Sequence, residues 1–192
     1  MTKKDLTVKN ISFFRHPASS TKPAANMSLP EVYKLITSDK YQAITSALRN
    51  ESDPNGRREM KEMQLDYITP SGVFYSRCDD GLKYHSEILC VDIDHMKDEA
   101  QLQDTKQTLI EDPYFHTLMM FRSPSGDGLK WFIPIDLKQC GHRKWFEAVR
   151  NYLHQTYSLT ADEKCINVSR SCFLCHDPEA YACEYIINNT NN

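Results

Sequence analysis

The stretch that decides the fold reads Leu89-Cys90-Val91-Asp92-Ile93-Asp94, the most strand-like part of the chain. Successive side chains of a strand point to opposite faces, so Val91 and Ile93 share one face and Asp92 and Asp94 the other. The two carboxylates then lie roughly 7 Å apart at their Cα atoms, and their oxygens can converge on one hard cation or bridge two. Magnesium or manganese suits such ligands best. The alternative is a solvent-exposed or salt-bridged polar face at a strand end.

Strand and helix patterns surround this stretch without strict alternation, which favours an α+β fold over a doubly wound sheet. We expect one helix that starts near Ser28, with Glu31 in its first turn, and further helices over 41–48, 98–112 and 142–157. A turn is expected over 50–58, and further strands over 11–15, 73–75, 118–121, 129–135, 171–174 and 182–187. The segments 1–55 (N-terminal strand and helices), 56–187 (core) and 188–192 (frayed tail) are expected to form one structural domain.

The composition excludes several classes of protein. The 192 residues include 23 Lys plus Arg and 26 Asp plus Glu, a net charge of −3, so the chain is no histone-like polycation, although a local basic groove remains possible. The sequence shows no signal-peptide pattern and no apolar run of about 18 residues, so we expect a cytoplasmic protein without a membrane partner.

The seven cysteines are expected to be reduced and mostly buried. Cys172-Phe173-Leu174-Cys175-His176 has the spelling of a haem attachment motif, but strand alternation sends its two cysteines to opposite faces. A zinc site is a second alternative, disfavoured because only one close cysteine pair exists; its ligands would come from Cys165, Cys172, Cys175, His176 and Cys183.

A glycine-containing turn, Ser123-Pro124-Ser125-Gly126-Asp127-Gly128-Leu129-Lys130, joins two apolar strands. Gly126 and Gly128 permit close approach of the backbone to a ligand, and successive N–H groups there can line an anion pocket. Serine hydroxyls and Lys130 add donors that suit a triphosphate. The spacing is not that of a P-loop, and an ordinary hairpin turn is the alternative.

Two further polar segments contain candidate site residues. In the segment 162–170, Asp162 or Glu163 offers a third carboxylate and Arg170 a phosphate contact, although a surface loop fits equally well. Arg57, Arg58 and Lys61 form a basic cluster on an expected helix, which alone also suits a solvated helix face.

Together these segments resemble the archaeo-eukaryotic primase superfamily, the primase-polymerases, whose members carry an hhhDhD/E strand, a glycine-containing turn ending in sxH and a later acidic segment. Lys130 stands where the usual histidine would be. More narrowly, the chain from about Gly56 to Cys183 resembles the VirE N-terminal primase-like domain. Five segments carry this resemblance in order: GRREMK (56–61), ITPSGVFYSR (68–77), LCVDIDH (89–95), SPSGDGLK (123–130) and SRSCFLCHDPEAY (169–181).

The resemblance implies a catalytic core built on an RRM-like antiparallel or mixed sheet with flanking helices. It implies metal ligation and catalysis by Asp92, Asp94 and Asp162, with Mg or Mn as the cofactor. Nucleotide phosphates are expected at Ser123, Ser125, Gly126, Gly128, Lys130 and Arg170. Template or primer contacts are expected at Arg57, Arg58, Lys61, Arg77 and Arg122, which suit sequence-independent phosphate binding.

The function implied is a metal-dependent nucleotidyltransferase of the DNA primase/polymerase kind, active in replication of a mobile element or phage-like system. Its partners would be single-stranded DNA template or primer, nucleoside triphosphates and a helicase-like module in the same or a companion chain. A second reading is a primase-fold module that binds nucleic acid without catalysis. A third is a structural adaptor whose acidic strand binds a cation for stability.

Overall fold

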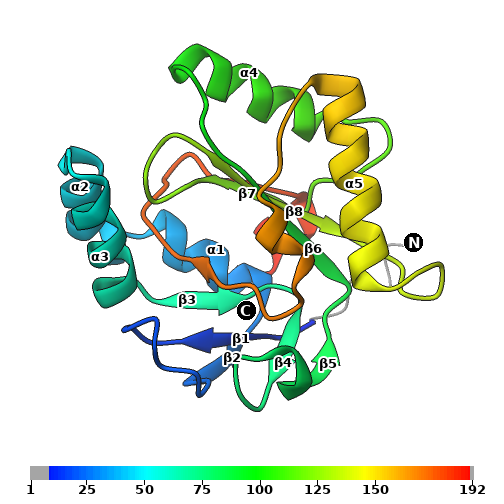
Figure 1. Cartoon of the computed structure of the whole chain (residues 1–192), viewed down its shortest axis with the longest axis horizontal. Coiled ribbons are helices and arrows are strands. Elements are labelled where there is room, and N and C mark those ends of the chain that lie inside the picture. The colour runs from blue at the N-terminus through cyan, green and yellow to red at the C-terminus, as the bar shows by residue number, and fades with distance from the viewer. Residues whose placement is uncertain (1–8, 191–192) are drawn as a thin grey trace.

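Antiparallel pairing joins all the strands of the computed structural model, which describes residues 9–190 (Figure 1). The structure is therefore α+β, as the sequence predicts. The expectations for the first eight residues and for the last two residues of the tail lie outside the described part.

The strands form two sheets and one hairpin. The first sheet has the order β2 (Ala25–Met27), β1 (Ile11–Phe14), β3 (Tyr67–Thr69) and β9 (Cys172–Phe173). The second has the order β10 (Tyr181–Ala182), β7 (Met119–Arg122), β8 (Leu129–Pro134) and β6 (Ile88–Ile93). The hairpin pairs β4 (Gly72–Phe74) with β5 (Leu82–His85) through the short helix η2 (Asp79–Gly81).

The helices lie around these sheets. Near the first sheet are α1 (Leu29–Thr37), η1 (Asp39–Tyr41), α2 (Gln42–Asn50) and α3 (Pro54–Gln64). The remaining helices are α4 (Glu99–Ile110), α5 (His142–Tyr157), η3 (Glu163–Ile166) and α6 (Glu184–Asn188). No helix within residues 9–190 is both long and apolar enough to cross a membrane.

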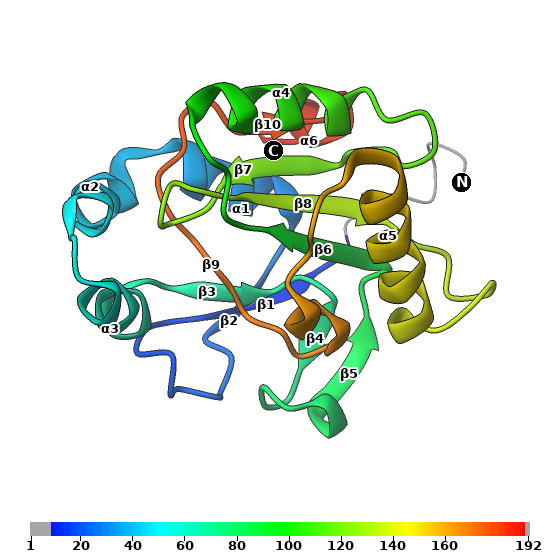
Figure 2. The ribbon, with the colours of Figure 1, turned by 45° about the horizontal axis from the view of Figure 1, so that its top comes forward.

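Strand alternation in β6 divides the hydrophobic core into two parts. Val91 and Ile93 face a cluster that includes Trp131 of β8 and residues of α4 and α5, which cover this side of the second sheet (Figure 2). The opposite face contributes Phe121 and Phe132 to a cluster shared with α1 and the first sheet. Asp92 lies on that opposite face, because its side chain alternates with those of Val91 and Ile93.

The starts of two helices show where local sequence rules succeed and fail. Ser28 and Glu31 form a capping box at the start of α1, as expected. The turn expected over 50–58 is wrong from Pro54 onward, where α3 begins. The side chain of Asp53 accepts hydrogen bonds from two backbone N–H groups of this helix, and Pro54 occupies its first position.

The last expected strand, 182–187, is also shorter than predicted. Pairing with β7 ends at Ala182, and the N–H of Cys183 donates to the carbonyl of Leu118. The chain then forms α6, whose Ile186 is buried. A short apolar run fits either a strand or a buried helical turn, and here tertiary packing selects the helix.

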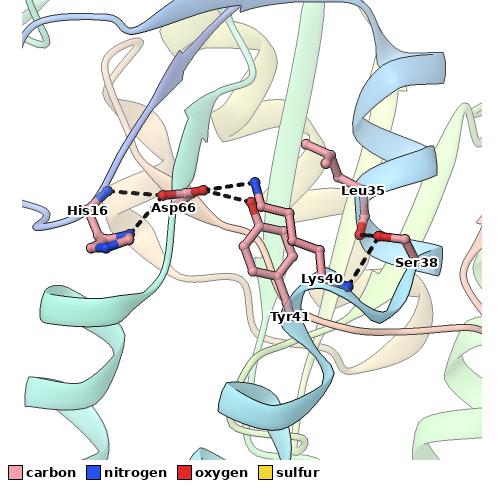
Figure 3. Close-up of polar contacts among 6 residues, drawn as sticks. All are labelled: His16, Leu35, Ser38, Lys40, Tyr41 and Asp66. Atoms are coloured by element: carbon pink, nitrogen blue, oxygen red, sulfur yellow. Dashed lines mark hydrogen bonds and ion pairs between the residues drawn. The ribbon is translucent and has the colours of Figure 1, made fainter.

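A buried carboxylate ties the first sheet to the helices beside it (Figure 3). Oδ1 of Asp66 accepts hydrogen bonds from the backbone N–H of His16 at 3.1 Å and from its ring Nδ1 at 2.9 Å. Oδ2 accepts from Lys40 Nζ at 3.1 Å and from Tyr41 Oη at 2.9 Å. These hydrogen bonds outweigh the effect of burial and lower the pKa of Asp66.

Candidate functional site

Asp92 and Lys130 form a buried ion pair at the centre of the site. They are direct partners in the antiparallel pairing of β6 with β8, and Lys130 Nζ donates to Asp92 Oδ2. The residue Asp92 is only 6% exposed, and its second oxygen, Oδ1, is buried without a hydrogen-bond partner. Burial alone would lower the pKa of Lys130, but the charges of Asp92 and Asp94 outweigh it and raise that pKa.

Asp94 follows directly after the end of β6. Burial and the neighbouring charge of Asp92 raise its pKa to about 6. The backbone of the glycine-containing turn lies against it: a Cβ atom placed on Gly128 would be 2.5 Å from Asp94 Oδ1 and 2.7 Å from the carbonyl oxygen of Ile93. Any side chain at position 128 would therefore displace its neighbours, and glycine lets the backbone approach Asp94 closely.

One cleft brings together most of the residues predicted to bind the metal ion or the nucleotide. Its lining includes both acids together with Ser123, Ser125 and Lys130 of the turn, and its volume is about 220 Å³. The cleft therefore places carboxylates opposite hydroxyl and ammonium donors.

Lys61 extends from α3 into the same cleft. Its Nζ donates to Ser125 Oγ at 3.4 Å. Burial and the positive charge of Lys130 lower the pKa of Lys61, against the opposing effect of Asp94. Lys61 thus supplies a second cation that faces the turn.

Three buried polar atoms at the glycine-containing turn and the neighbouring acid have no hydrogen-bond partner among the described residues. Across residues 9–190, the buried side-chain nitrogen and oxygen atoms without a hydrogen-bond partner are Asp92 Oδ1, Ser123 Oγ and Arg49 Nε. Arg49 belongs to the same place, because its Nη2 donates to the carbonyl of Ser123 at 3.3 Å and its side chain lies against Gly126, which has a φ of +87°. Such atoms are rare in folded proteins and indicate strain, catalysis or a missing ligand.

Asp162 and Arg170 lie at the boundary with a neighbouring cavity. The backbone N–H of Asp162 donates to the carbonyl of Asp92 at 2.8 Å, but its carboxylate pairs with Arg170 Nη2 at 2.6 Å. Asp162 lines the cavity beside Asp94, whereas Arg170 lines both that cavity and the cleft. Within residues 9–190, no group of three or more His, Cys, Asp or Glu side chains is arranged to hold a metal ion.

Four predicted nucleic-acid contacts lie elsewhere. Arg58 pairs with Glu62 on the outer surface of α3, and Arg57 is half-buried on the same helix. Arg77 donates to the hydroxyl of Tyr67 and to a backbone carbonyl, and its guanidinium lies over the Tyr67 ring.

Arg122 lies on the far side of the second sheet from the cleft. It pairs with Leu129 in the β7–β8 register, so it shares a face with Leu129 rather than with Lys130. Its Nε donates to the carbonyl of Gly126 at 2.6 Å, and its Nη1 pairs with Glu99 at 2.9 Å. These contacts support the turn from behind.

Two ionisable residues of the cleft were missed although they stand beside predicted ones. His95 follows Asp94 directly and has a positive φ of 66°. Asp127 lies within the glycine-containing turn, and its carbonyl accepts a hydrogen bond from the N–H of Met96. The sequence signal that could have found them is their position, directly after the acidic strand and within the glycine-containing turn. Arg49 had no such signal, since it lies 74 residues from Ser123.

The donor set at Asp92 and Asp94 suits a magnesium or manganese ion held partly by the protein. Mg²⁺ is commonly bound through one or two carboxylates, with water and substrate phosphates as the other ligands. The unpartnered Asp92 Oδ1 and the raised pKa of Asp94 are both features that a bound cation would relieve. The two acids therefore fit such an ion.

Comparison with known proteins gives one family. Residues 60–181, more than half of the chain, match the model of the BT4734-like, N-terminal domain. Comparisons with the curated proteins and with the solved structures found no match. The matched region contains Asp92, Asp94, the glycine-containing turn and Arg170. The chain therefore belongs to the BT4734-like N-terminal domain family.

Proposed function

We propose that this domain is a nucleotidyltransferase of the primase-polymerase kind, acting at the cleft between Asp92, Asp94 and the glycine-containing turn. The reaction is attack of a 3′-hydroxyl on the α-phosphate of a nucleoside triphosphate. The new bond joins the 3′ oxygen to that phosphorus, the hydroxyl proton passes to solvent, the bond to the bridging oxygen breaks, and pyrophosphate leaves. The observation that carries the proposal is the unpartnered, buried oxygen of Asp92. It lies beside a second carboxylate, in a cleft lined with hydrogen-bond donors that suit a phosphate.

Asp92 and Asp94 are the groups that would hold magnesium or manganese. The ion, when bound, supplies activation of the nucleophile and stabilisation of the charge that develops on the leaving group. The role of Lys130 is to neutralise Asp92, which lets two acids occupy one partly buried place. An ammonium group thus stands at the position where the primase-polymerases that the sequence resembles carry a histidine.

The other side of the cleft suits the triphosphate. Ser123 Oγ is buried and unpartnered, so it is free to donate to a phosphate oxygen. Lys61 and Arg170 add positive charge at the rim. Arg49 and Arg122 hold the turn from behind through the carbonyls of Ser123 and Gly126.

The fold is compatible with the RRM-like core that we propose for the catalytic sheet. In the second sheet β6 and β7 flank β8, all three antiparallel, and α4 and α5 cover one face. The acids lie at the end of β6, on the face away from these helices. Replication of a mobile element, with a helicase-like module as partner, remains part of the proposal through the sequence resemblance alone.

A second candidate function is nucleic-acid binding without catalysis. The Asp92–Lys130 ion pair favours it, because an ammonium group already satisfies one oxygen of the acid that would hold the metal. The two functions differ in whether the pair opens to a divalent cation.

Primer extension tests the proposal. The wild-type protein is incubated with a primed template, all nucleotides and either Mg²⁺ or Mn²⁺, beside Asp92→Asn, Asp94→Asn and the control Asp104→Asn. Asp104 is an exposed acid on α4, away from the cleft. We expect extension by the wild type and the control, and a loss of at least about 100-fold in the other two variants. Equal activity in all four proteins contradicts the proposal, and inactivity of the wild type favours the second candidate.

A further inference from the structure

The β4–β5 hairpin exposes two aromatic rings. Tyr75 is 72% exposed and Tyr84 is 44% exposed. Single exposed apolar residues are common, but two rings on one short hairpin are a feature of binding surfaces. The hairpin is a separate two-stranded sheet whose β4 lies against β1, and Figure 2 shows η2 at its outer end.

Positive charge accompanies these rings. The ammonium nitrogen of Lys83 lies 5.5 Å from the centroid of the Tyr75 ring, so the cation and the ring share one side of the hairpin. The exposed Lys22 lies on a neighbouring loop, where the carbonyl of Thr21 accepts a hydrogen bond from the N–H of Arg77, two residues after Tyr75. An aromatic face flanked by cations is the arrangement that stacks nucleobases and attracts their phosphates.

The hairpin is physically continuous with the cleft. The N–H and the hydroxyl of Ser169 donate to Asp79 Oδ1 at 3.1 and 2.5 Å, so the loop that carries Arg170 is tied to η2. Arg170 lines the cleft beside Asp92 and Asp94. Figures 1 and 2 both show the segment after η3 running beside β4. A chain leaving the cleft past Arg170 therefore meets the hairpin next.

We infer that the β4–β5 hairpin binds single-stranded nucleic acid as it leaves the cleft, with bases stacked on Tyr75 and Tyr84 and phosphates near Lys83 and Lys22. This inference rests on the proposed function, since the strand is the one that the cleft extends or copies. Binding is independent of sequence, because any base offers a π face and any phosphate a charge. The exposed Asp80 at the hairpin tip opposes the phosphates.

Fluorescence anisotropy with a labelled oligothymidine measures the contact. We expect Tyr75→Leu to raise the dissociation constant about tenfold, which is typical for the loss of one stacking ring. Tyr75→Phe keeps the ring and is expected to stay within about twofold of the wild type. The matched control is Tyr114→Leu, because Tyr114 is 78% exposed and packs edge-on against Tyr152. We expect no change there.

A second pair of variants tests the charges. Lys83→Ala is expected to weaken binding and to flatten its dependence on salt, whereas Asp80→Asn is expected to tighten binding. Unchanged circular dichroism of each variant shows that the hairpin still folds.

The outcomes separate this inference from the proposed function. Oligothymidine binding that Tyr75→Leu leaves unchanged, or that Tyr114→Leu weakens equally, overturns the hairpin site even if primer extension succeeds. A wild type that does not bind the oligonucleotide also overturns it. Weaker binding by Tyr75→Leu together with a wild type that extends no primer supports the hairpin site and contradicts nucleotide transfer.

Discussion

Asp66 and Asp92 are both buried carboxylates, but their surroundings differ. Asp66 is 2% exposed, and its two side-chain oxygens accept four hydrogen bonds from His16, Lys40 and Tyr41 (Figure 3). Asp92 is 6% exposed, pairs with Lys130 through one oxygen and has no partner for the other. A second acid, Asp94, lies beside it.

The difference separates a structural acid from a candidate functional one. Four donors satisfy Asp66, so its charge is stabilised within the fold and its pKa is lowered. The region of Asp92 keeps an unsatisfied oxygen and two neighbouring negative charges, which cost stability without a ligand. Proteins keep such costs mainly at functional sites.

Removing the satisfied carboxylate is expected to have the largest effect on stability. Asp66→Ala removes the acceptor of four hydrogen bonds to a charged group and leaves the buried Tyr41 hydroxyl unpaired, so we expect a loss of about 3–5 kcal/mol in the free energy of unfolding. Chemical denaturation followed by circular dichroism measures it, with Asp104→Ala as the exposed-acid control. A midpoint unchanged from the wild type would show that Asp66 is not the anchor of this region.

Breaking the ion pair of the site is expected to give the next largest effect. Lys130→Met keeps much of the side-chain volume but leaves the charge of Asp92 buried and unpaired. In the presence of a chelator, the free energy of unfolding should therefore be about 3 kcal/mol lower than that of the wild type. Magnesium or manganese should restore part of this loss by taking the place of the ammonium group. The readout is thermal unfolding with and without the cation. Asp66→Ala keeps the site, so the cation should stabilise it no more than it stabilises the wild type. A shift for Lys130→Met that is no larger than this one contradicts the distinction.

The close approach of the turn to Asp94 is expected to matter less. A methyl group on Gly128 would lie 2.5 Å from Asp94 Oδ1, so Gly128→Ala should displace the turn and lower the free energy of unfolding by about 1–3 kcal/mol. The matched control is Gly141→Ala, where nothing lies within 4 Å of the added Cβ. Equal unfolding midpoints for the two variants would contradict the packing described here.

Removing the second site acid is expected to stabilise the protein slightly. The pKa of Asp94 is about 6 in the folded protein, above the ordinary value of 3.8, so its ionisation begins to cost stability above about pH 4 and the cost is complete above about pH 6. Asp94→Asn should add about 1 kcal/mol at pH 7.5, once the partial exposure of the carboxylate is allowed for. The gain should fade as the pH falls and disappear below about pH 4. A gain that does not change with pH would contradict this cause.

Local sequence rules predicted the two acids and the lysine at the centre of the site, but not the arginines that hold the glycine-containing turn in place. Alternation along β6 placed Asp92 and Asp94 on one face, and the antiparallel register then brought Lys130 opposite Asp92. The same rule, applied to β7, would have turned Arg122 away from the cleft, but it needs the register with β8, which one sequence does not provide.

Long-range contacts explain the remaining misses. Arg49 reaches Ser123 across 74 residues, and His16 reaches Asp66 across 50. Neither contact has a local spacing that a sequence pattern could show. The role of the third predicted carboxylate also depends on tertiary structure. The backbone of Asp162 lies beside β6, but its side chain pairs with Arg170.

The central claim is that Asp92 holds a divalent cation together with a nucleoside triphosphate. Isothermal titration of a non-hydrolysable triphosphate into the protein, with and without Mn²⁺, tests it directly. We predict one-to-one binding that requires the cation and is lost in Asp92→Asn while Asp104→Asn binds normally. Binding that is equal in wild type and Asp92→Asn, or equal with and without Mn²⁺, would contradict the account.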